Sequence, residues 1–384
     1  MQRRLSLLAA ASLAALACLP SAAFAQANEV VIGATLSASG PGASLGIPEK
    51  NTLEMLPKTL GGLPVRYVIY DDATDPALAT KNARRLVDEN KADAIIGSST
   101  TPSTLAVTEV AFETKTPQLA LSPLPPTIRQ HQWVFPMPQP VPVMAGALLE
   151  HMKAKGVKTL GFIGYADAYG ESWLKAVEAG VEAAGVKMVA VERYARTDTS
   201  VNAQVLKLTA ATPDAVLIAG SGTPSALPQL TLRERGYKGQ IYQTHGSANS
   251  DFLRVAGKSD EGLVLPTGPV LVAEQLPDSH PSKPVSLAYL KAYEAKFGPG
   301  SRNTFGAHAQ DAYLVLDKAV AIAAAKARPG TPEFRAALRD AIEATKNLPV
   351  THGVMNMTPA DHNGFDARAR VLITVKGDSW QLVK

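Results

Sequence analysis

Residues 65–90, VRYVIYDDATDPALATKNARRLVDEN, contain the unit that decides the fold. Val65 to Tyr70 is typical of a strand, which ends at Asp71-Asp72. Asp75-Pro76 then predicts the start of a helix, because aspartate can cap free backbone N–H groups and proline suits the first helical position. Apolar residues recur at helical spacing up to Asn90: Leu78, Ala79, Ala83, Leu86 and Val87. The stretch therefore predicts a strand followed by an amphipathic helix.

The same alternation extends in both directions from this unit. Residues 30–36 predict a strand on its N-terminal side. On its C-terminal side, residues 94–97 and 118–121 predict strands, and residues 104–113 predict a helix between them. Strands that alternate with helices form a parallel sheet that is covered on both faces. The sequence therefore predicts an α/β fold.

A proline-rich segment divides the chain into two series. Pro123–Pro126 and residues 135–140 contain too many prolines for either a helix or a strand. A second series follows, with helices predicted at 143–155, 171–184, 201–210 and 224–235, and strands at 159–163, 187–194, 215–219 and 241–244. We therefore predict two α/β lobes of similar size, connected near residues 136–142.

The C-terminal part of the chain returns to both lobes. After a loop-rich stretch at 266–284, helices are predicted at 285–297, 304–326 and 331–345, and a hairpin at 371–383. Too few strands accompany these helices to form a separate domain, so we expect the helices to cover the first lobe. The predicted divisions are a signal peptide at 1–25, an N-terminal lobe at 26–138 and 268–363, and a C-terminal lobe at 139–267 and 364–384.

The N-terminus has the pattern of a secretory signal peptide. Arg3 and Arg4 precede an uncharged apolar run, and Ala23-Phe24-Ala25 places small residues before Gln26. We expect export and cleavage after Ala25. The apolar run is too short to span a bilayer comfortably, which argues against a membrane anchor. Cys18, the only cysteine, lies within this segment, so the mature chain would contain no thiol. Lipidation of Cys18 is the alternative.

Composition argues against several classes of protein. Without Arg3 and Arg4 the chain has 36 basic and 34 acidic residues, with no run of like charge, so we expect no nucleic-acid partner. A second long apolar stretch is missing, so we do not expect an integral membrane protein. The seven histidines contain no pair at the spacing of a zinc helix, and residues 361–366 do not fit an EF-hand register. We predict no metal and no cofactor.

Polar and aromatic residues follow the predicted strands, where open parallel sheets bind their ligands. They are Ser37, Ser39, Ser98, Ser99, Thr100, Thr101 and Ser122 in the first lobe, and Tyr165, Tyr169, Ser221, Thr223 and His245 in the second. Residues 98–101 lead directly into a helix N-terminus, which favours an anion. A small carboxylate is the expected ligand; ordinary caps and turns are the alternative role for each hydroxyl.

One motif suggests catalysis. Residues 42–46, GASLG, match the nucleophile elbow of hydrolases, which would make Ser44 the nucleophile. That elbow needs its serine directly between a strand and a helix, whereas here the strand ends near Leu36 and Pro41 intervenes. We therefore predict no catalytic residue and no enzyme; a hydrolase that uses Ser44 is kept as the alternative from another class.

Five short stretches, in their order and spacing, match a known family. They are Ile32-Gly33-Ala34 with Ser39-Gly40-Pro41, Tyr70-Asp71-Asp72 with Asp75-Pro76, Ile96-Gly97 with Ser98–Pro102, Leu121-Ser122-Pro123, and Tyr169-Gly170-Glu171. The chain resembles the Leu/Ile/Val-binding family of periplasmic solute receptors of ABC transporters. The resemblance implies a type I periplasmic binding protein: two Rossmann-like lobes, a hinge of three crossovers, and a ligand delivered to membrane permease subunits.

The resemblance also implies roles for single residues. It places a ligand carboxylate on Ser98, Ser99, Thr100 and the turn from Leu121 to Ser122. It packs Leu45 against the ligand and puts Tyr169 in the pocket wall.

Two departures from the family pattern bear on the ligand. His245 stands where amino-acid receptors hold the α-ammonium with an acid, and a hydroxyl is lost in the Pro123–Pro126 run. Both favour a carboxylate without an α-amino group, an aromatic or other organic acid. The alternatives are a receptor for Leu/Ile/Val-like amino acids and a sensory receptor.

Overall fold

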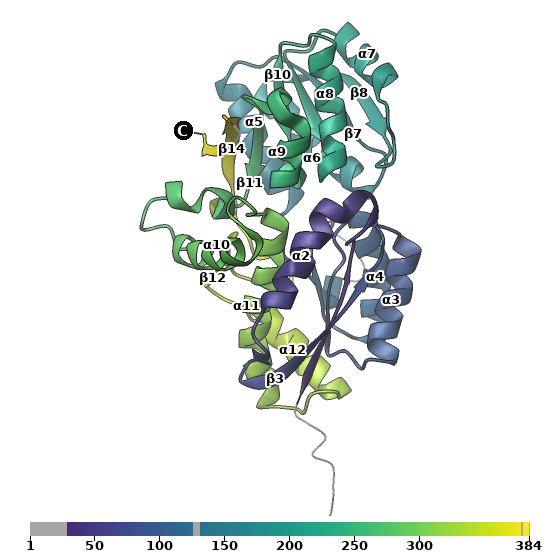
Figure 1. Ribbon diagram of the computed structural model, residues 1–384, viewed down its shortest axis with the longest axis vertical. Helices are drawn as coiled ribbons and strands as arrows, with labels where there is room; N and C mark the ends of the chain where they lie inside the picture. The colour runs from purple at the N-terminus through teal and green to yellow at the C-terminus, as the bar shows by residue number, and fades with distance from the viewer. Residues whose placement is uncertain (1–28, 126–130, 378, 384) are drawn as a thin grey trace, which may run out of the picture.

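The computed structural model describes residues 29–125, 131–377 and 379–383. The predicted signal peptide and Pro126 lie outside these residues. The described chain forms two lobes, one above the other in Figure 1, each with a central sheet flanked by helices. In the described part of the chain, the helices are all too short or too polar to cross a membrane.

The first lobe is built on a six-stranded sheet. Its strand order is β2-β3-β1-β4-β5-β6, with all neighbours parallel except β2 and β3. The strands are β1 (Val30–Leu36), β2 (Thr59–Leu60), β3 (Leu63–Asp71), β4 (Ala94–Gly97), β5 (Gln118–Ala120) and β6 (Val134–Pro136). One face packs against α2 (Ala43–Met55), α11 (Thr304–Ala324) and α12 (Pro332–Glu343), and the other against α3 (Pro76–Asp88) and α4 (Thr101–Thr114).

The second lobe is built on a seven-stranded sheet of order β15-β14-β11-β10-β9-β7-β8. Its strands are β7 (Thr159–Tyr165), β8 (Lys187–Tyr194), β9 (Ala215–Ala219), β10 (Gln240–Gln243), β11 (Val264–Thr267), β14 (Val371–Lys376) and β15 (Ser379–Leu382). Its helices are α5 (Val141–Ala154), α6 (Ala168–Ala184), α7 (Asn202–Ala210), α8 (Ala226–Glu234) and α9 (Ser250–Ala256). Strands β7 to β11 run parallel, and the predicted hairpin β14–β15 adds an antiparallel edge.

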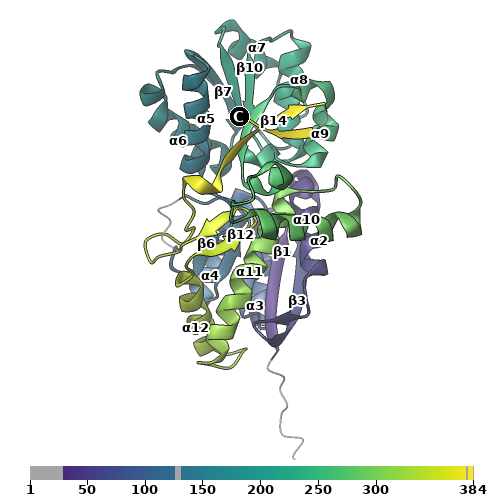
Figure 2. The same cartoon turned by 90° about the vertical axis from the view of Figure 1, so that its left-hand side faces the viewer.

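Three passages of the chain join the lobes: after β6, after β11 and before β14. Side chains hold the first and third passages together. Asn363 Nδ2 donates to the carbonyls of Pro136 at 3.0 Å and Pro138 at 2.6 Å, and Gln139 Nε2 donates to the carbonyl of Ala369 at 2.9 Å. Helix α10 (Lys283–Phe297) and the hairpin of β12 (Leu348–Val350) and β13 (Gly353–Met355) lie at the level where the lobes meet (Figure 2).

Most predicted elements are confirmed, and the exceptions have physical reasons. Asp75 caps α3 as predicted, accepting from the amides of Ala77 at 2.7 Å and Leu78 at 3.1 Å. The segment around Pro136 was expected to be irregular, yet it forms β6, because an edge strand tolerates a missing N–H. Helix α2 was not predicted, and β11 begins just before the stretch expected to be loop. The exact lobe boundaries stay a prediction.

Candidate functional site

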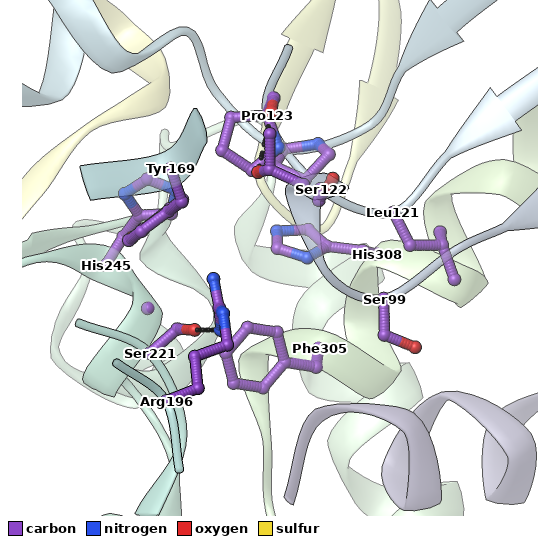
Figure 3. A pocket seen from close by; sticks show the side chains of 13 residues that line it. Ser99, Leu121, Ser122, Pro123, Tyr169, Arg196, Ser221, His245, Phe305 and His308 are labelled. Carbon is purple, nitrogen blue, oxygen red and sulfur yellow. Dashed lines mark hydrogen bonds between the residues drawn. The ribbon is translucent and has the colours of Figure 1, made fainter. Parts of the chain in front are cut away.

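A cavity lies between the two lobes, with about 300 Å³ of empty space when the part open to solvent is included. Both lobes and the first passage between them contribute to its wall (Figure 3). The lining residues are Ser99, Thr101, Leu121, Ser122, Pro123, Pro138, Phe305 and His308 from the first-lobe side, and Tyr169, Arg196, Ser221, His245 and Gly246 from the second lobe.

Half of the predicted site residues line this cavity. Those brought together are Ser99, Thr101, Leu121, Ser122, Tyr169, Ser221 and His245. Those outside the lining are Ser37, Ser39, Leu45, Ser98, Thr100, Tyr165 and Thr223. The second group divides into residues that serve internal bonds, residues at the contact between the lobes, and one exposed serine.

Asp72, directly after β3, accepts a hydrogen bond from the hydroxyl of Ser98. This buried carboxylate accepts hydrogen bonds from Ser98 Oγ at 2.6 Å, Ser37 Oγ at 2.8 Å and Thr35 Oγ1 at 3.1 Å. It thereby ties together the carboxyl ends of β1, β3 and β4. Ser98 consequently does not offer its hydroxyl to the cavity, and its predicted contact with a ligand carboxylate finds no geometric support here.

Ser99 reaches the cavity, but its hydroxyl donates a hydrogen bond to a buried acid. Its Oγ donates to Glu49 of α2 and accepts from the backbone amide of Ser37 at 2.9 Å. Figure 3 shows this hydroxyl turned away from the cavity centre. Burial, reinforced by the charge of Asp72, raises the pKa of Glu49. The hydroxyl-rich surface predicted from the sequence is therefore largely committed to internal bonds.

The N-terminus of α4 nevertheless remains suited to an anion. No side chain of the described residues caps this helix, and two residues at its start, Ser99 and Thr101, line the cavity. The N–H groups of a first helical turn have no intrahelical acceptor and carry a partial positive charge. The hydroxyl of Thr100, the N-cap residue, is buried without a partner among the described residues. The anion site at this end of α4 stays a prediction.

Two predicted residues lie where the lobes touch. The backbone amide of Thr223 donates to Ser44 Oγ at 3.1 Å, which joins the second lobe to the start of α2. Leu45 packs beside Gly222 at the same contact. Ser44 thus binds a backbone amide of the other lobe, and a 3-10 turn at residues 40–42 separates it from β1, unlike the sharp turn of a nucleophile elbow. Ser39 is exposed at the start of that turn.

Arg196 is the main residue that the sequence reasoning missed. Its Nε donates to Asp167 at 2.6 Å, one terminal nitrogen donates to Ser221 Oγ at 2.8 Å, and its guanidinium lies 4.1 Å from the centre of the Tyr165 ring. Tyr165 itself donates to the carbonyl of Ser221 at 2.7 Å. These contacts fix a cation whose side chain is only 11% exposed at the cavity wall. Figure 3 shows the guanidinium directed toward the space between His245 and His308.

A signal for Arg196 was present in the sequence. It follows the predicted strand at 187–194, and none of the candidate residues came from the carboxyl end of that strand. The polar side chains of the predicted site were hydroxyls and one imidazole, with no arginine or lysine. The structure adds a cation, because an oriented arginine lines the cavity.

Two buried histidines face the cavity from opposite lobes. His245 begins a 3-10 turn after β10 and is 4% exposed, and His308 lies on α11 and is 1% exposed. Neither ring has a hydrogen-bond partner for its nitrogens among the described residues. Burial, reinforced by the charge of His352, lowers the pKa of His245 to about 3. Burial, with His352 and then His245, holds the pKa of His308 well below its usual range.

Helix α11 supplies both Phe305 and His308. The sequence predicted this helix correctly as a cover for the first lobe, and most of its apolar side chains do pack on that sheet. Its first turns, however, extend past the sheet to the cavity. A contribution from a helix N-terminus so distant in sequence could not be inferred from strand ends alone.

The fold and the cavity between its lobes define the class of protein. Two parallel-sheet lobes, three connecting passages and an interlobe cavity are the architecture of a type I periplasmic binding protein. A family model described as periplasmic binding protein matches residues 29–376, and the chain belongs to this family. The predicted membership of the Leu/Ile/Val-binding group is confirmed.

Known relatives agree with this placement. An extracellular ligand-binding receptor from Rhodopseudomonas palustris HaA2 has 50% identity and a TM-score of 0.91, covering 93% of this chain and 100% of its own. The leucine-, isoleucine-, valine-, threonine- and alanine-binding protein of Pseudomonas aeruginosa is 25% identical, over 70% of this chain and 72% of its own. An ABC-transporter solute-binding protein from R. palustris, solved in complex with benzoate, shares the fold, with a TM-score of 0.80 at 20% identity over 92% of this chain and 95% of its own.

Proposed function

We propose that this periplasmic solute-binding protein receives a small organic carboxylate between its lobes and delivers it to the permease of an ABC transporter. The ligand in this proposal is an aromatic or other organic acid without an α-ammonium group. The observation that carries it is Arg196, a nearly buried cation fixed by Asp167 and Ser221 at the wall of a cavity with no acidic residue among its described lining.

A carboxylate suits the free hydrogen-bond donors of this cavity. A guanidinium has five N–H donors, and the bonds to Asp167 and Ser221 use two of them. Its remaining donors can bind a carboxylate through charge-assisted hydrogen bonds. The uncapped N-terminus of α4, on the first-lobe side, adds further N–H groups. Binding to both sides would link the two lobes through the ligand and favour their closure.

An α-ammonium would find little support in the same cavity. It would need an anionic partner to balance its charge, and the described lining contains Arg196 and two imidazoles but no acidic side chain. The name of the 25%-identical relative keeps a Leu/Ile/Val-like amino acid as the alternative ligand. The benzoate-bound relative shows only that this fold can enclose an aromatic acid.

Isothermal titration calorimetry with benzoate, hexanoate and leucine tests the proposal. We expect a carboxylate without an amino group to bind more tightly than leucine, and Arg196→Gln to weaken that binding at least tenfold. The control is Arg193→Gln, because Arg193 lies three residues earlier, near the end of β8, but is exposed and paired with Glu171. Preferred binding of leucine, undiminished in Arg196→Gln, would contradict the proposal. Mass spectrometry of the ligand released on denaturation identifies the natural solute.

Cleavage after Ala25 belongs to the same proposal. A receptor that meets its permease outside the cytoplasmic membrane has to be exported, and residues 1–25 have the required pattern. The mature protein isolated from the periplasmic fraction should begin at Gln26. N-terminal sequencing checks this, and a mature chain that begins at a lipid-modified Cys18 would favour the alternative.

A further inference from the structure

The two cavity histidines form an unusual pair. His245 and His308 come from different lobes, and all four of their ring nitrogens are buried without hydrogen-bond partners among the described residues. Both rings line the cavity that contains Arg196 (Figure 3). Buried polar atoms in folded proteins are almost always hydrogen-bonded, so such a group needs an explanation. Two of them in one cavity point to a ligand group that binds there.

Both rings are held by contacts with other aromatic rings. His308 stacks on His352 with ring centroids 4.1 Å apart, and His352 is held by Asp311 at 2.7 Å and by Thr304 at 2.9 Å. His245 packs against the Trp173 ring at a centroid distance of 5.6 Å. The rings are therefore fixed by aromatic contacts and leave their nitrogen atoms for the cavity.

The chemistry of the pair selects the ligand group. A neutral imidazole has one N–H donor and one acceptor nitrogen, so two such rings can give a hydrogen bond to a group and accept one from it. A hydroxyl group satisfies both, because it donates one bond and accepts others. A carbonyl oxygen could only accept, and a methyl group would leave the nitrogens unsatisfied. An ammonium group would bring a second positive charge into a cavity that already contains Arg196.

We infer that the ligand carries an uncharged hydroxyl group in addition to its carboxylate, and that His245 and His308 bind this hydroxyl from opposite lobes. This inference rests on the proposed function and names the substrate class within it: hydroxy acids. Arg196 binds the carboxylate, and the two imidazoles distinguish hydroxylated acids from plain ones. The pair is complete only when the lobes are closed, so the hydroxyl also favours the closed form.

Matched pairs of acids test the inference by calorimetry on the whole mature protein. The probes are benzoate with 3- and 4-hydroxybenzoate, phenylacetate with 4-hydroxyphenylacetate, and hexanoate with 6-hydroxyhexanoate. In the best-bound pair we expect the hydroxylated acid to bind at least tenfold more tightly, because the plain acid leaves buried nitrogens unpaired. In His308→Phe and in His245→Phe this preference should fall to within about threefold. Phenylalanine keeps an aromatic ring in place, and thermal unfolding shows whether each variant is folded.

The controls separate this inference from the proposed function. His151→Phe removes a histidine outside the cavity, which bonds to Tyr242 at 2.9 Å, and should leave the preference unchanged. Equal binding within every pair, or a preference that survives both cavity variants, overturns the inference but not the proposed function if Arg196→Gln still weakens binding. Failure of all the acids to bind overturns both. As a second readout, a released natural ligand should contain at least one oxygen beyond its carboxylate, and one without it would also refute the inference.

Discussion

The backbone amide of Thr223 in the second lobe donates a hydrogen bond to Ser44 Oγ in the first lobe, with 3.1 Å between the two atoms. Gly222, the preceding residue, fits this contact because it has no side chain. A Cβ on Gly222 would lie 2.5 Å from Ser44 Oγ and 2.7 Å from Leu45 Cδ1, and its φ of +64° also favours glycine. The lobes are therefore in direct contact beside the cavity, as expected for the closed form of a hinged receptor.

Gly222→Ala should impair closure and weaken ligand binding at least tenfold. The added methyl group would collide with Ser44 and Leu45 only when the lobes meet. The matched control is Gly257→Ala, because Gly257 has φ +49° and ψ −140°, close to the +64° and −162° of Gly222, with no described atom within 4 Å of a Cβ. Both variants share the backbone strain, so only Gly222→Ala should lose affinity in calorimetry. Similar losses in both would mean that strain, and not contact between the lobes, is responsible.

Ser44→Ala should leave a binding protein that is only mildly weakened. The substitution removes the acceptor for the Thr223 amide, a bond worth about 1 kcal/mol, or roughly fivefold in the dissociation constant. A nucleophile would behave differently, because its loss would abolish turnover of a small ester or amide. The measurement is calorimetry together with an ester hydrolysis assay. Turnover by the wild type that disappears in Ser44→Ala would support the hydrolase alternative.

Ligand binding should weaken as the pH falls from 7.5 to 5.5. In the closed form burial lowers the pKa of His245 to about 3, whereas opening exposes the ring to water and returns its pKa toward about 6.5. Below that value the open form takes up a proton that the closed form cannot hold. The advantage of closure is therefore complete above about pH 6.5 and declines below it, by roughly tenfold per imidazole at pH 5.5.

The surroundings of the two rings allow a sharp control for this pH dependence. Arg196, Tyr169 and the His352–Asp311 pair are the charged and titratable groups near them. His245→Phe should reduce the pH dependence, while His151→Phe should keep it in full. Calorimetry at the two pH values checks both variants. Binding that is as strong at pH 5.5 as at pH 7.5 would show that the rings do not stay neutral in the closed form.

Asp72→Ala should destabilise the first lobe by about 3 kcal/mol, because several buried hydrogen-bond donors lose their common acceptor. Asp71→Ala is the neighbouring control, since Asp71 is exposed and accepts from the amides of Ser39 and Ala73. We expect the Asp71 variant to lose less than about 1 kcal/mol. Urea unfolding measures both. A loss at Asp71 as large as that at Asp72 would contradict this role for the buried carboxylate.

The sequence was sufficient for the fold because local signals agreed with one another. The Asp75-Pro76 cap, the strand at residues 215–219 and the C-terminal hairpin all depend on residues close in sequence, and each is found in the structure. Helix α2 was missed because its apolar residues do not form one clear face, and glycine and proline occur in and around it.

The site was harder to predict, because its chemistry depends on partners that are distant in sequence. Ser98 and Ser99 looked like ligand donors until the structure placed the buried acids Asp72 and Glu49 against them. His308 is 63 residues from His245 in sequence but lines the same cavity. Hydroxyls at strand ends predict where a ligand can bind. Which of them remain available is decided by tertiary contacts.

The order of the strands in the second sheet has a consequence for biogenesis. Strand β14, which pairs with β11, lies more than 100 residues later in the sequence, after α10, α11 and α12. If the chain is secreted with its N-terminus first, neither lobe can be completed until nearly all of the chain has crossed the membrane. Folding of the lobes should therefore finish only after secretion is nearly complete. Truncation of residues 371–383 should leave an exposed sheet edge and increase proteolysis.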